Sequence, residues 1–445
     1  MSYWKKWNAL LLCLTVVQVI AQAQSGRSFT MAEAQEYGVQ NNTDLKRAQL
    51  NIQSGQTVLT SQKSVGLPQV NLGVDYTHFI TLPTQLIPAE FFGGEPGQFA
   101  ELQFGVPENL TATLSASQLL FSGPYIYGLQ AAKVYVELLQ YQSQVTLSDI
   151  RKNVELAYYN VLIVDEQSRL LQNDLKTIEK TLFEMTEMYK QGFIEETDVD
   201  RMRITYSNLL TSQNNLVRQK EVAKNLLKFQ MGMDLTEQIE LTDSLRTLRD
   251  DFIVLENDMN YLTRPEFNVA QTNVELNALN VKVSKAAYYP TLALYGSYAQ
   301  AAQRDKFNFL DWDQPWFETS LVGVQLNLPV FAGMQRSAAV QDATIGLERS
   351  ELAKVDVTRG IQLEISKYTA EYKNAQEDLN NQISNMELAY KIYNRTLIKY
   401  REGVGSSVEL TEAENTVFNA QRSYISALYN VLSSRTNLKK SLGYL

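Results

Sequence analysis

Residues that build chemical centres are almost absent from this sequence. Its 445 residues include one Cys and one His. This scarcity excludes a disulfide framework and a Cys–His nucleophile pair, and it argues against zinc, which takes several Cys or His ligands. His78 lies in a segment with strand periodicity, and the sequence has neither a Gly-x-Ser-x-Gly turn nor a glycine-rich phosphate loop. We therefore expect no enzyme, no cofactor and no bound metal.

Helix-breaking residues are scarce as well. Gly (21) and Pro (10) together make up well under a tenth of the chain, so long uninterrupted elements are expected. The N-terminus resembles a secretory signal peptide, because Lys5 and Lys6 precede an apolar stretch over 9–20 and the small residues Ala21 and Ala23. We predict a signal peptide over 1–23. An uncleaved membrane anchor is the alternative.

Long apolar runs and excess positive charge are also missing. After the N-terminal segment no run of 18 apolar residues follows, so a membrane-bound form of this chain would have to use a β-barrel. The formal net charge is −9. Because nucleic-acid binding depends on clustered Lys and Arg that neutralise phosphates, we expect no nucleic-acid partner.

The sequence contains an internal repeat. Tyr189-Lys190-Gln191-Gly192-Phe193 recurs as Tyr400-Arg401-Glu402-Gly403-Val404, and Phe121-Ser122-Gly123 recurs as Phe331-Ala332-Gly333. Each half has the pattern helix, strand, strand, long helix, shorter helix. We predict a first repeat over 24–235, an acidic linker over 236–260 and a second repeat over 261–445.

The long helices carry a heptad pattern. Apolar residues in both repeats recur at alternating spacings of three and four, the pattern of a coiled-coil seam. The predicted helix from Pro124 to Lys190 would measure about 100 Å at 1.5 Å per residue. Because a compact globular domain does not hold a helix of this length, we expect an extended helical assembly.

Four segments of about ten residues alternate between apolar and small or polar side chains, which is typical of membrane barrel strands. They lie at 70–77, 109–117, 292–298 and 322–328. Four strands do not close a barrel around a pore, whereas three chains would supply twelve. The predicted fold class is mainly α with a small β part. An amphipathic strand of a soluble sandwich is the alternative for any single segment.

The chain resembles the TolC-like outer-membrane efflux proteins over nearly its whole mature length. The similarity rests on the duplicated layout, on Phe29-Thr30-Met31-Ala32-Glu33-Ala34 and Arg264-Pro265-Glu266 at the starts of the repeats, and on Leu328-Pro329-Val330-Phe331-Ala332-Gly333 and Tyr400-x-x-Gly403. The resemblance implies a homotrimer in the outer membrane of a Gram-negative bacterium, with a twelve-stranded barrel and a twelve-helix periplasmic tunnel. It also implies a periplasmic adaptor protein and an inner-membrane pump as partners.

The two helices of each predicted pair are joined by one glycine-containing turn. One includes Gly192 and Phe193, and the other includes Gly403, Val404, Gly405 and Ser406. Glycine allows the left-handed backbone that ends a helix, and the polar residues that follow can cap the next one. The resemblance implies that these tips contact the adaptor. Plain turns without a docking role are the alternative.

The resemblance also implies a gate beside the tips. Glu409 and Glu412 are three residues apart, hence on one face of a helix, where the family has an acidic pair at the periplasmic constriction. Thr197 and Asp198 match the polar pair of the first repeat, and Tyr400 matches the aromatic residue that bonds to it. Gly405 occupies the position of a family Arg, so other residues such as Arg401 would have to link the helices. Helix-start acids favoured by the macrodipole are the alternative.

Together these features predict a passive export channel for drugs, toxic compounds or secreted polypeptides. A secreted structural or adhesive coiled-coil protein without a pore is the alternative. The loops at 80–107 and 300–316 would then be extracellular. An aromatic set near the second loop is either a girdle at the membrane surface or the core of a folded loop; it comprises Tyr298, Phe307, Phe309, Trp312, Trp316 and Phe317.

Overall fold

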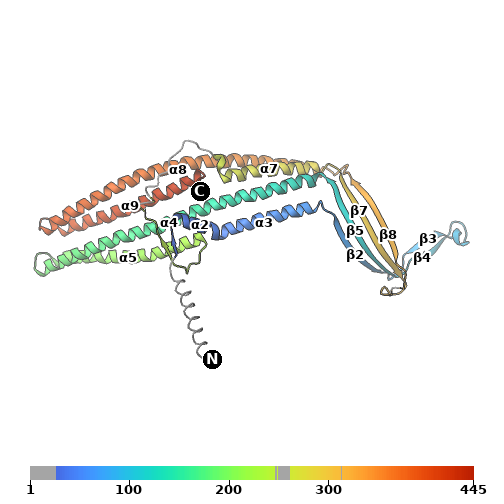
Figure 1. Cartoon of the computed structure of the whole chain (residues 1–445), viewed down its shortest axis with the longest axis horizontal. Coiled ribbons are helices and arrows are strands. Elements are labelled where there is room, and N and C mark those ends of the chain that lie inside the picture. Colours follow the sequence, from blue (N-terminus) through green and yellow to red (C-terminus); the bar gives the residue numbers. More distant parts are fainter. Residues whose placement is uncertain (1–26, 246–247, 249–260, 312) are drawn as a thin grey trace, which may run out of the picture. The chain divides into compact units, whose positions relative to one another are not determined.

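The computed structural model describes residues 27–245, 248, 261–311 and 313–445. The predicted signal peptide, most of the predicted linker and Trp312 lie outside the described residues. The chain divides into two compact units. Unit 1 consists of Met1–Asn51, Leu139–Gln271 and Ala353–Leu445, and unit 2 consists of Ile52–Leu138 and Thr272–Leu352. Figure 1 shows long helices and a group of strands.

The helices of the described chain are α2 (Met31–Asn41), α3 (Thr43–Ser64), α4 (Gly123–Lys190), α5 (Glu196–Met231), α7 (Pro265–Ala286), α8 (Gln335–Arg401) and α9 (Ser407–Ser441). The long helix expected to end at Lys190 is confirmed as α4, with 68 residues. Thr30 caps α2 and exchanges bonds with Glu33 in a capping box, as the sequence pattern predicts. None of the described helices is long and apolar enough to cross a membrane.

The core of unit 1 is built from the heptad positions of its helices. Near the ends of α4 and α8, Ile178 and Met185 of α4 pack in one apolar cluster with Met202 of α5 and with Tyr393 and Leu410 of α8 and α9. Further along, a second cluster joins α4, α8 and α9 around residues such as Tyr159, Tyr372 and Leu428. The heptad prediction is therefore confirmed, and each hairpin of helices buries its seam against the other.

Unit 1 also contains a short parallel sheet. Strand β1 (Arg27–Phe29) pairs with β6 (Ile239–Leu241). The buried hydroxyl of Tyr158 on α4 donates a hydrogen bond to the carbonyl of Phe29 at 2.9 Å and lies 3.0 Å from a carboxylate oxygen of Asp243. These contacts attach the start of the described chain to the middle of α4.

Unit 2 contains an antiparallel sheet of four strands in the order β2-β5-β7-β8. The strands are β2 (Gln69–His78), β5 (Glu108–Ser122), β7 (Thr291–Arg304) and β8 (Phe317–Asn327). They coincide with the four predicted segments, and the register is continuous except for a bulge between Leu119 and Phe121. The four-strand prediction is confirmed.

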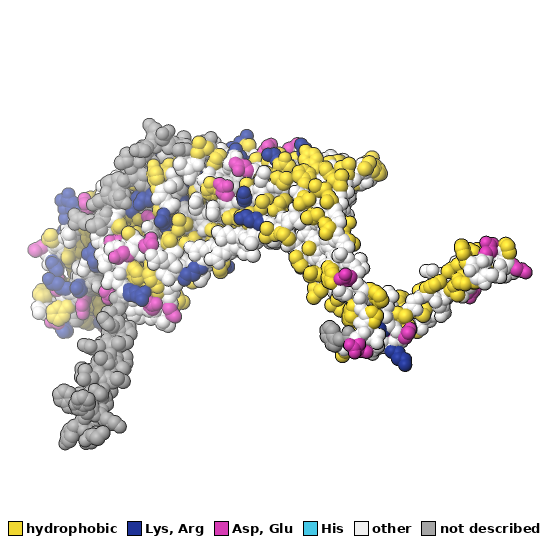
Figure 2. All heavy atoms as spheres, turned by 45° about the vertical axis from the view of Figure 1, so that its right-hand side comes forward, with side chains coloured by type: hydrophobic (Ala, Val, Ile, Leu, Met, Phe, Trp, Pro, Cys, Tyr) yellow, Lys and Arg dark blue, Asp and Glu magenta, His cyan; other side chains and the backbone are white. Residues whose placement is uncertain are grey.

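The register separates the two faces of this sheet. Leu72 lies opposite Leu114, which in turn lies opposite Tyr298, and these apolar side chains are exposed on the single chain. On the other face, Gly73 lies opposite Thr113 and then Ala299. Hydrophobic side chains accordingly gather over the strands in Figure 2, whereas Lys, Arg, Asp and Glu are spread over the helices.

The segment predicted as a long loop at 80–107 contains structure that the sequence analysis missed. Strands β3 (Thr84–Pro88) and β4 (Phe99–Gln103) form an antiparallel hairpin, joined through the short 3-10 helix η1 (Ala89–Phe92). Glycines that adopt positive φ at Gly93 and Gly97 close its turn. Each strand has only five residues, too few for a clear alternation in the sequence.

The aromatic residues near the second loop are partly core. Phe307 and Phe309 contact each other edge to face, at 5.3 Å between ring centroids, and both contact Tyr76 of β2. Phe309 is buried, whereas Phe307 and Phe317 are exposed. These contacts favour a packed loop core for Phe309, one of the two interpretations of this set.

Candidate functional site

The first tip is the turn between α4 and α5. Gly192 ends α4 with φ +78°, a left-handed conformation that costs an L-residue with a side chain roughly 1–2 kcal/mol. Glu195 then caps α5: the backbone N–H of Glu195 donates to the Asp198 carboxylate at 3.3 Å, in a capping box between the two residues. Thr197 donates to Glu195 at 3.2 Å. Phe193, which follows the glycine in this turn, is exposed.

The second tip is the turn between α8 and α9. Gly403 has φ +76°, and the backbone N–H of Gly405 donates to the carbonyl of Lys399 at 3.1 Å. A Cβ on Gly405 would lie 3.0 Å from the backbone nitrogen of Tyr400, so the turn is tightest there. Ser406 caps α9 by accepting a bond from the N–H of Glu409 at 3.1 Å.

Two polar contacts join the hairpins close to their tips. The hydroxyl of Ser407, a buried residue at the start of α9, donates to a carboxylate oxygen of Asp198 at the start of α5. Arg401 at the end of α8 donates through Nε and Nη2 to the Glu184 carboxylate of α4, at 3.1 and 2.8 Å. Charge-assisted bonds of this kind are stronger than neutral ones. The tips of the two hairpins are therefore held together by one partly buried and one exposed contact.

Tyr400 does not make the bond that the resemblance implies. Its side chain is buried, but among the described residues its hydroxyl has no hydrogen-bond partner. Burial, together with the nearby Asp198 carboxylate, raises the pKa of Tyr400 to about 12. Ser407 bonds to Asp198 instead, because the tight turn at Gly405 places the first residue of α9 beside the first turn of α5.

Glu409 and Glu412 lie on the first turns of α9 and are exposed on the single chain. Both are separated from the buried seam of this helix, which Leu410 and Ala413 occupy. Within the described residues neither glutamate side chain makes an ion pair. Both carboxylates are therefore accessible to solvent on the single chain.

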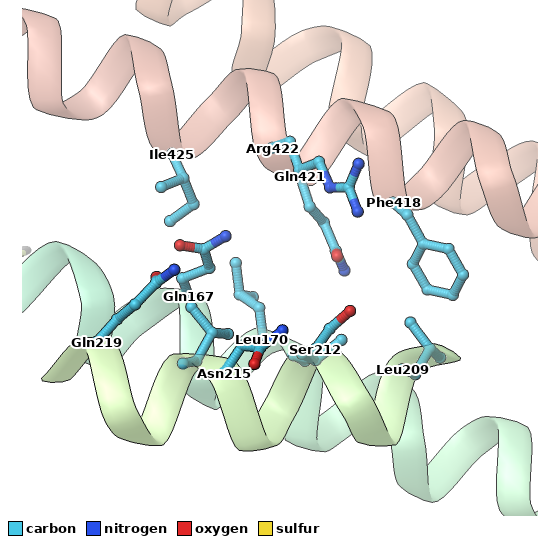
Figure 3. A pocket seen from close by; sticks show the side chains of 12 residues that line it. Gln167, Leu170, Leu209, Ser212, Asn215, Gln219, Phe418, Gln421, Arg422 and Ile425 are labelled. Atoms are coloured by element: carbon cyan, nitrogen blue, oxygen red, sulfur yellow. The ribbon is translucent and has the colours of Figure 1, made fainter. Parts of the chain in front are cut away.

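A cavity separates the hairpins further from the tips. It has a volume of about 320 Å³ and is lined by residues of α4, α5 and α9, among them Gln167, Leu209, Asn215, Phe418 and Gln421. Figure 3 shows these side chains converging from three helices, with amide groups beside apolar ones.

Ser407 and Glu184 were missed from the sequence. Their partners are 209 and 217 residues away along the chain, so no local pattern marks them. For Ser407, the internal repeat gives a weak indication, because it aligns the turn after α8 with the turn after α4 and so marks both as equivalent tips. Arg401, suggested as a substitute for the missing family Arg, does link α8 to α4.

Comparisons with known proteins agree with this architecture. The profile of the family described as "Outer membrane efflux protein" matches residues 39–232 and 261–444. The toluene efflux pump outer membrane protein TtgF of Pseudomonas putida is 25% identical over 428 residues, covering 94% of this chain and 84% of that protein. The outer membrane protein TolC of Escherichia coli is 22% identical over 428 residues, covering 91% and 80%.

Among solved structures, the CmeC outer membrane channel of Campylobacter jejuni aligns with a TM-score of 0.74 and 17% identity, over 93% of this chain and 85% of that one. The resemblance stated from the sequence motifs is thereby confirmed, and the alternative of a structural protein without a pore receives no support. The chain belongs to the outer membrane efflux protein family.

Proposed function

We propose that the chain is the outer-membrane channel of a tripartite export system, through which solutes or polypeptides leave passively. The observation that carries this proposal is the four-stranded sheet, which has one apolar face, one small or polar face and an end strand on each side, β2 and β8. Strands of 10 to 15 residues, tilted in a barrel, are long enough for the hydrocarbon layer of a membrane.

Three chains complete this sheet. A sheet edge carries unpaired N–H and C=O groups, which lipid does not satisfy. Pairing β2 of one chain with β8 of the next would close a barrel of twelve strands and leave its apolar face to lipid and its polar face to water. The paired helices of the same three chains would form a twelve-helix tunnel on the periplasmic side.

The tips of the helical hairpins are proposed as the docking surface for a periplasmic adaptor. Two apolar residues at these tips are largely exposed to solvent: Phe193 is 73% exposed and Val404 is 77% exposed. They project from turns whose shape depends on Gly192, Gly403 and Gly405, with Ser406 as the cap. An inner-membrane pump would supply the energy, since the channel itself needs no chemical step.

The gate is proposed to lie beside these tips. In a trimer, Glu409 and Glu412 would place six carboxylates around one passage, which favours cations. Thr197, Asp198 and Tyr400 lie next to the contacts that hold the hairpins together, so movement of α8 and α9 away from α4 and α5 would break the Ser407–Asp198 bond and open the passage.

The domain division is proposed as a signal peptide over 1–23, repeats over 24–235 and 261–445, and a linker over 236–260. It is supported by the recurrence of helix, two strands, long helix and shorter helix in the order of elements.

Native mass measurement of the protein extracted from outer membranes in detergent tests the assembly. We expect three chains, and ion conduction when the same sample is added to planar bilayers. A monomer that inserts stably in membranes would refute the trimer. A trimer that conducts no ions would refute the channel.

A further inference from the structure

Glu414 is a buried acid that the gate does not use. It lies on α9 two residues after Glu412, but on the opposite side of the helix, and its residue exposure is 2%. Neither carboxylate oxygen has a hydrogen-bond partner within the described part of the chain. Buried polar groups are nearly always paired in native structures, so an unpaired carboxylate calls for a specific explanation.

The carboxylate of Glu414 faces a small cavity between three helices of unit 1. The cavity has a volume of about 50 Å³, enough for water. Its wall is formed by Asp174, Thr177 and Ile178 of α4, Tyr390 and Tyr393 of α8, and Val417 and Phe418 of α9. Apart from Glu414, the titratable groups in this wall are thus one acid and two tyrosines, and none of the lining residues is Lys, Arg or His.

The second acid, Asp174, is only partly satisfied. One of its oxygens accepts a bond from Gln421 Nε2 at 3.1 Å, and the same nitrogen lies 2.6 Å from the hydroxyl of Tyr390. The other oxygen, Asp174 Oδ2, has no partner among the described groups. The nearby cations are engaged elsewhere, since Arg401 pairs with Glu184 and Arg169 pairs with Glu166.

A carboxylate buried without a cation favours its neutral, protonated form, because burial penalises the charge. Burial accordingly raises the pKa of Glu414 to about 7. It also raises the pKa of Asp174 to about 6, although the bond from Gln421 opposes this shift.

We propose that Glu414 is a proton-binding site, and that a proton bound there stabilises the packing of α9 against α4 and α8 next to the tips. The packed state binds a proton that the solvated, loosened state releases. The stabilisation of the packed helices is therefore complete below the ordinary pKa of a glutamate. It falls as the pH rises towards the raised pKa of Glu414 and is lost above that pKa. In the upper part of that interval, above the raised pKa of Asp174, Glu414 titrates alone and the ratio of packed to loosened helices should fall about tenfold per pH unit. This inference does not depend on the channel function, since every group involved belongs to one chain.

Labelling of a buried thiol tests the proposal on the full chain in detergent. Cys13 is replaced by Ser, and Ala413, which is buried beside Glu414, is replaced by Cys. The rate at which a thiol reagent labels the Ala413→Cys variant is divided by the rate for the Ser384→Cys variant, whose thiol is at an exposed site on α8. This ratio corrects for the pH dependence of thiol ionisation. Between about pH 6 and pH 7, above the raised pKa of Asp174 and below that of Glu414, the corrected rate should rise roughly tenfold per unit.

Glu414→Gln should remove the pH dependence between about pH 6 and pH 7, where Asp174 is already ionised, and leave the helices packed over that range. Glu387→Gln, an exposed acid on α8, is the matched control and should retain the wild-type profile. A corrected profile unchanged by Glu414→Gln overturns the proposal.

Infrared spectroscopy of the chain without the introduced thiol gives an independent measurement. The band of a protonated carboxyl group should persist to near neutral pH and be lost in Glu414→Gln; an unchanged band overturns the proposal. Replacing Na⁺ and K⁺ by a bulky organic cation should have no effect. If the replacement loosens the wild-type helices but not the Glu414→Gln variant, a bound metal cation rather than a proton balances the carboxylate.

Discussion

Removing the hydroxyl of Ser407 should open the proposed gate. Ser407→Ala deletes the bond from the buried start of α9 to Asp198, while the cap of α9 by Ser406 stays intact. A hydrogen bond to a charged partner contributes roughly 1.5–3 kcal/mol. Because Asp198 is only half-buried, water recovers part of this when the bond is lost, so we expect a cost of about 1 kcal/mol per chain.

In the proposed trimer the three contacts break together when the passage opens. The total of about 3 kcal/mol corresponds to a roughly 150-fold increase in the ratio of open to closed channels. Single-channel recording in planar bilayers measures this ratio. Ser384→Ala is the control, because that exposed hydroxyl bonds only to the carbonyl of Asn380 on its own helix.

A double-mutant cycle with Asp198→Asn separates the bond from other effects of either change. The two substitutions should be non-additive, since both remove the same interaction. If Ser407→Ala leaves the open probability at the wild-type value, or if the two effects simply add, the Ser407–Asp198 contact does not hold the channel closed.

Three further outcomes are expected. The double variant Glu409→Gln with Glu412→Gln should lower cation selectivity, measured as a smaller reversal potential in a salt gradient, because it removes six charges from a trimer; an unchanged potential would place the gate elsewhere. Gly403→Ala should destabilise its turn by roughly 1–2 kcal/mol, because the φ of +76° is unfavourable for alanine, and hydrogen exchange of the turn amides should be faster, whereas Gly360→Ala inside α8 should not weaken the protein. Tyr158→Phe should lower the free energy of unfolding by about 1–2 kcal/mol, because its buried bond to Phe29 is lost; an unchanged denaturation midpoint would show that water replaces that hydroxyl.

Elements with a strong repeat were predictable from the sequence. The helix now seen as α4 and the four strands of unit 2 follow from periodicities of about 3.5 and 2, because each side chain's face depends only on its position along a regular backbone. The turns at Gly192 and Gly403 were predictable for a related reason, since the left-handed backbone is costly for other residues. The hairpin of β3 and β4 was missed because its strands have five residues each, too few to establish a period.

The role of Glu414 was present in the sequence but not recognised. Leu410, Glu414, Val417 and Gln421 follow each other at spacings of four, three and four, so they share one face of α9, and that face is the buried seam. Glu409 and Glu412, by contrast, lie outside this seam and are exposed. The heptad pattern determines that Glu414 is turned inward, but only the packing of α4 and α8 against α9 decides that no Lys, Arg or His of the described residues lines its cavity.

The sequence by itself determined the long helices, the four strands and the positions of the tips, because these depend on local spacing and on the conformational limits of single residues, and its motifs carried the resemblance that indicated the class of protein. The tertiary structure alone decided which polar groups meet. Ser407 bonds to Asp198, Arg401 pairs with Glu184, and the hydroxyl of Tyr400 has no hydrogen-bond partner in the part of the chain that the structure describes. Contacts between residues about two hundred positions apart depend on how two helical hairpins pack. A shift of one helix by a single turn would exchange these partners without altering any pattern within the helices themselves.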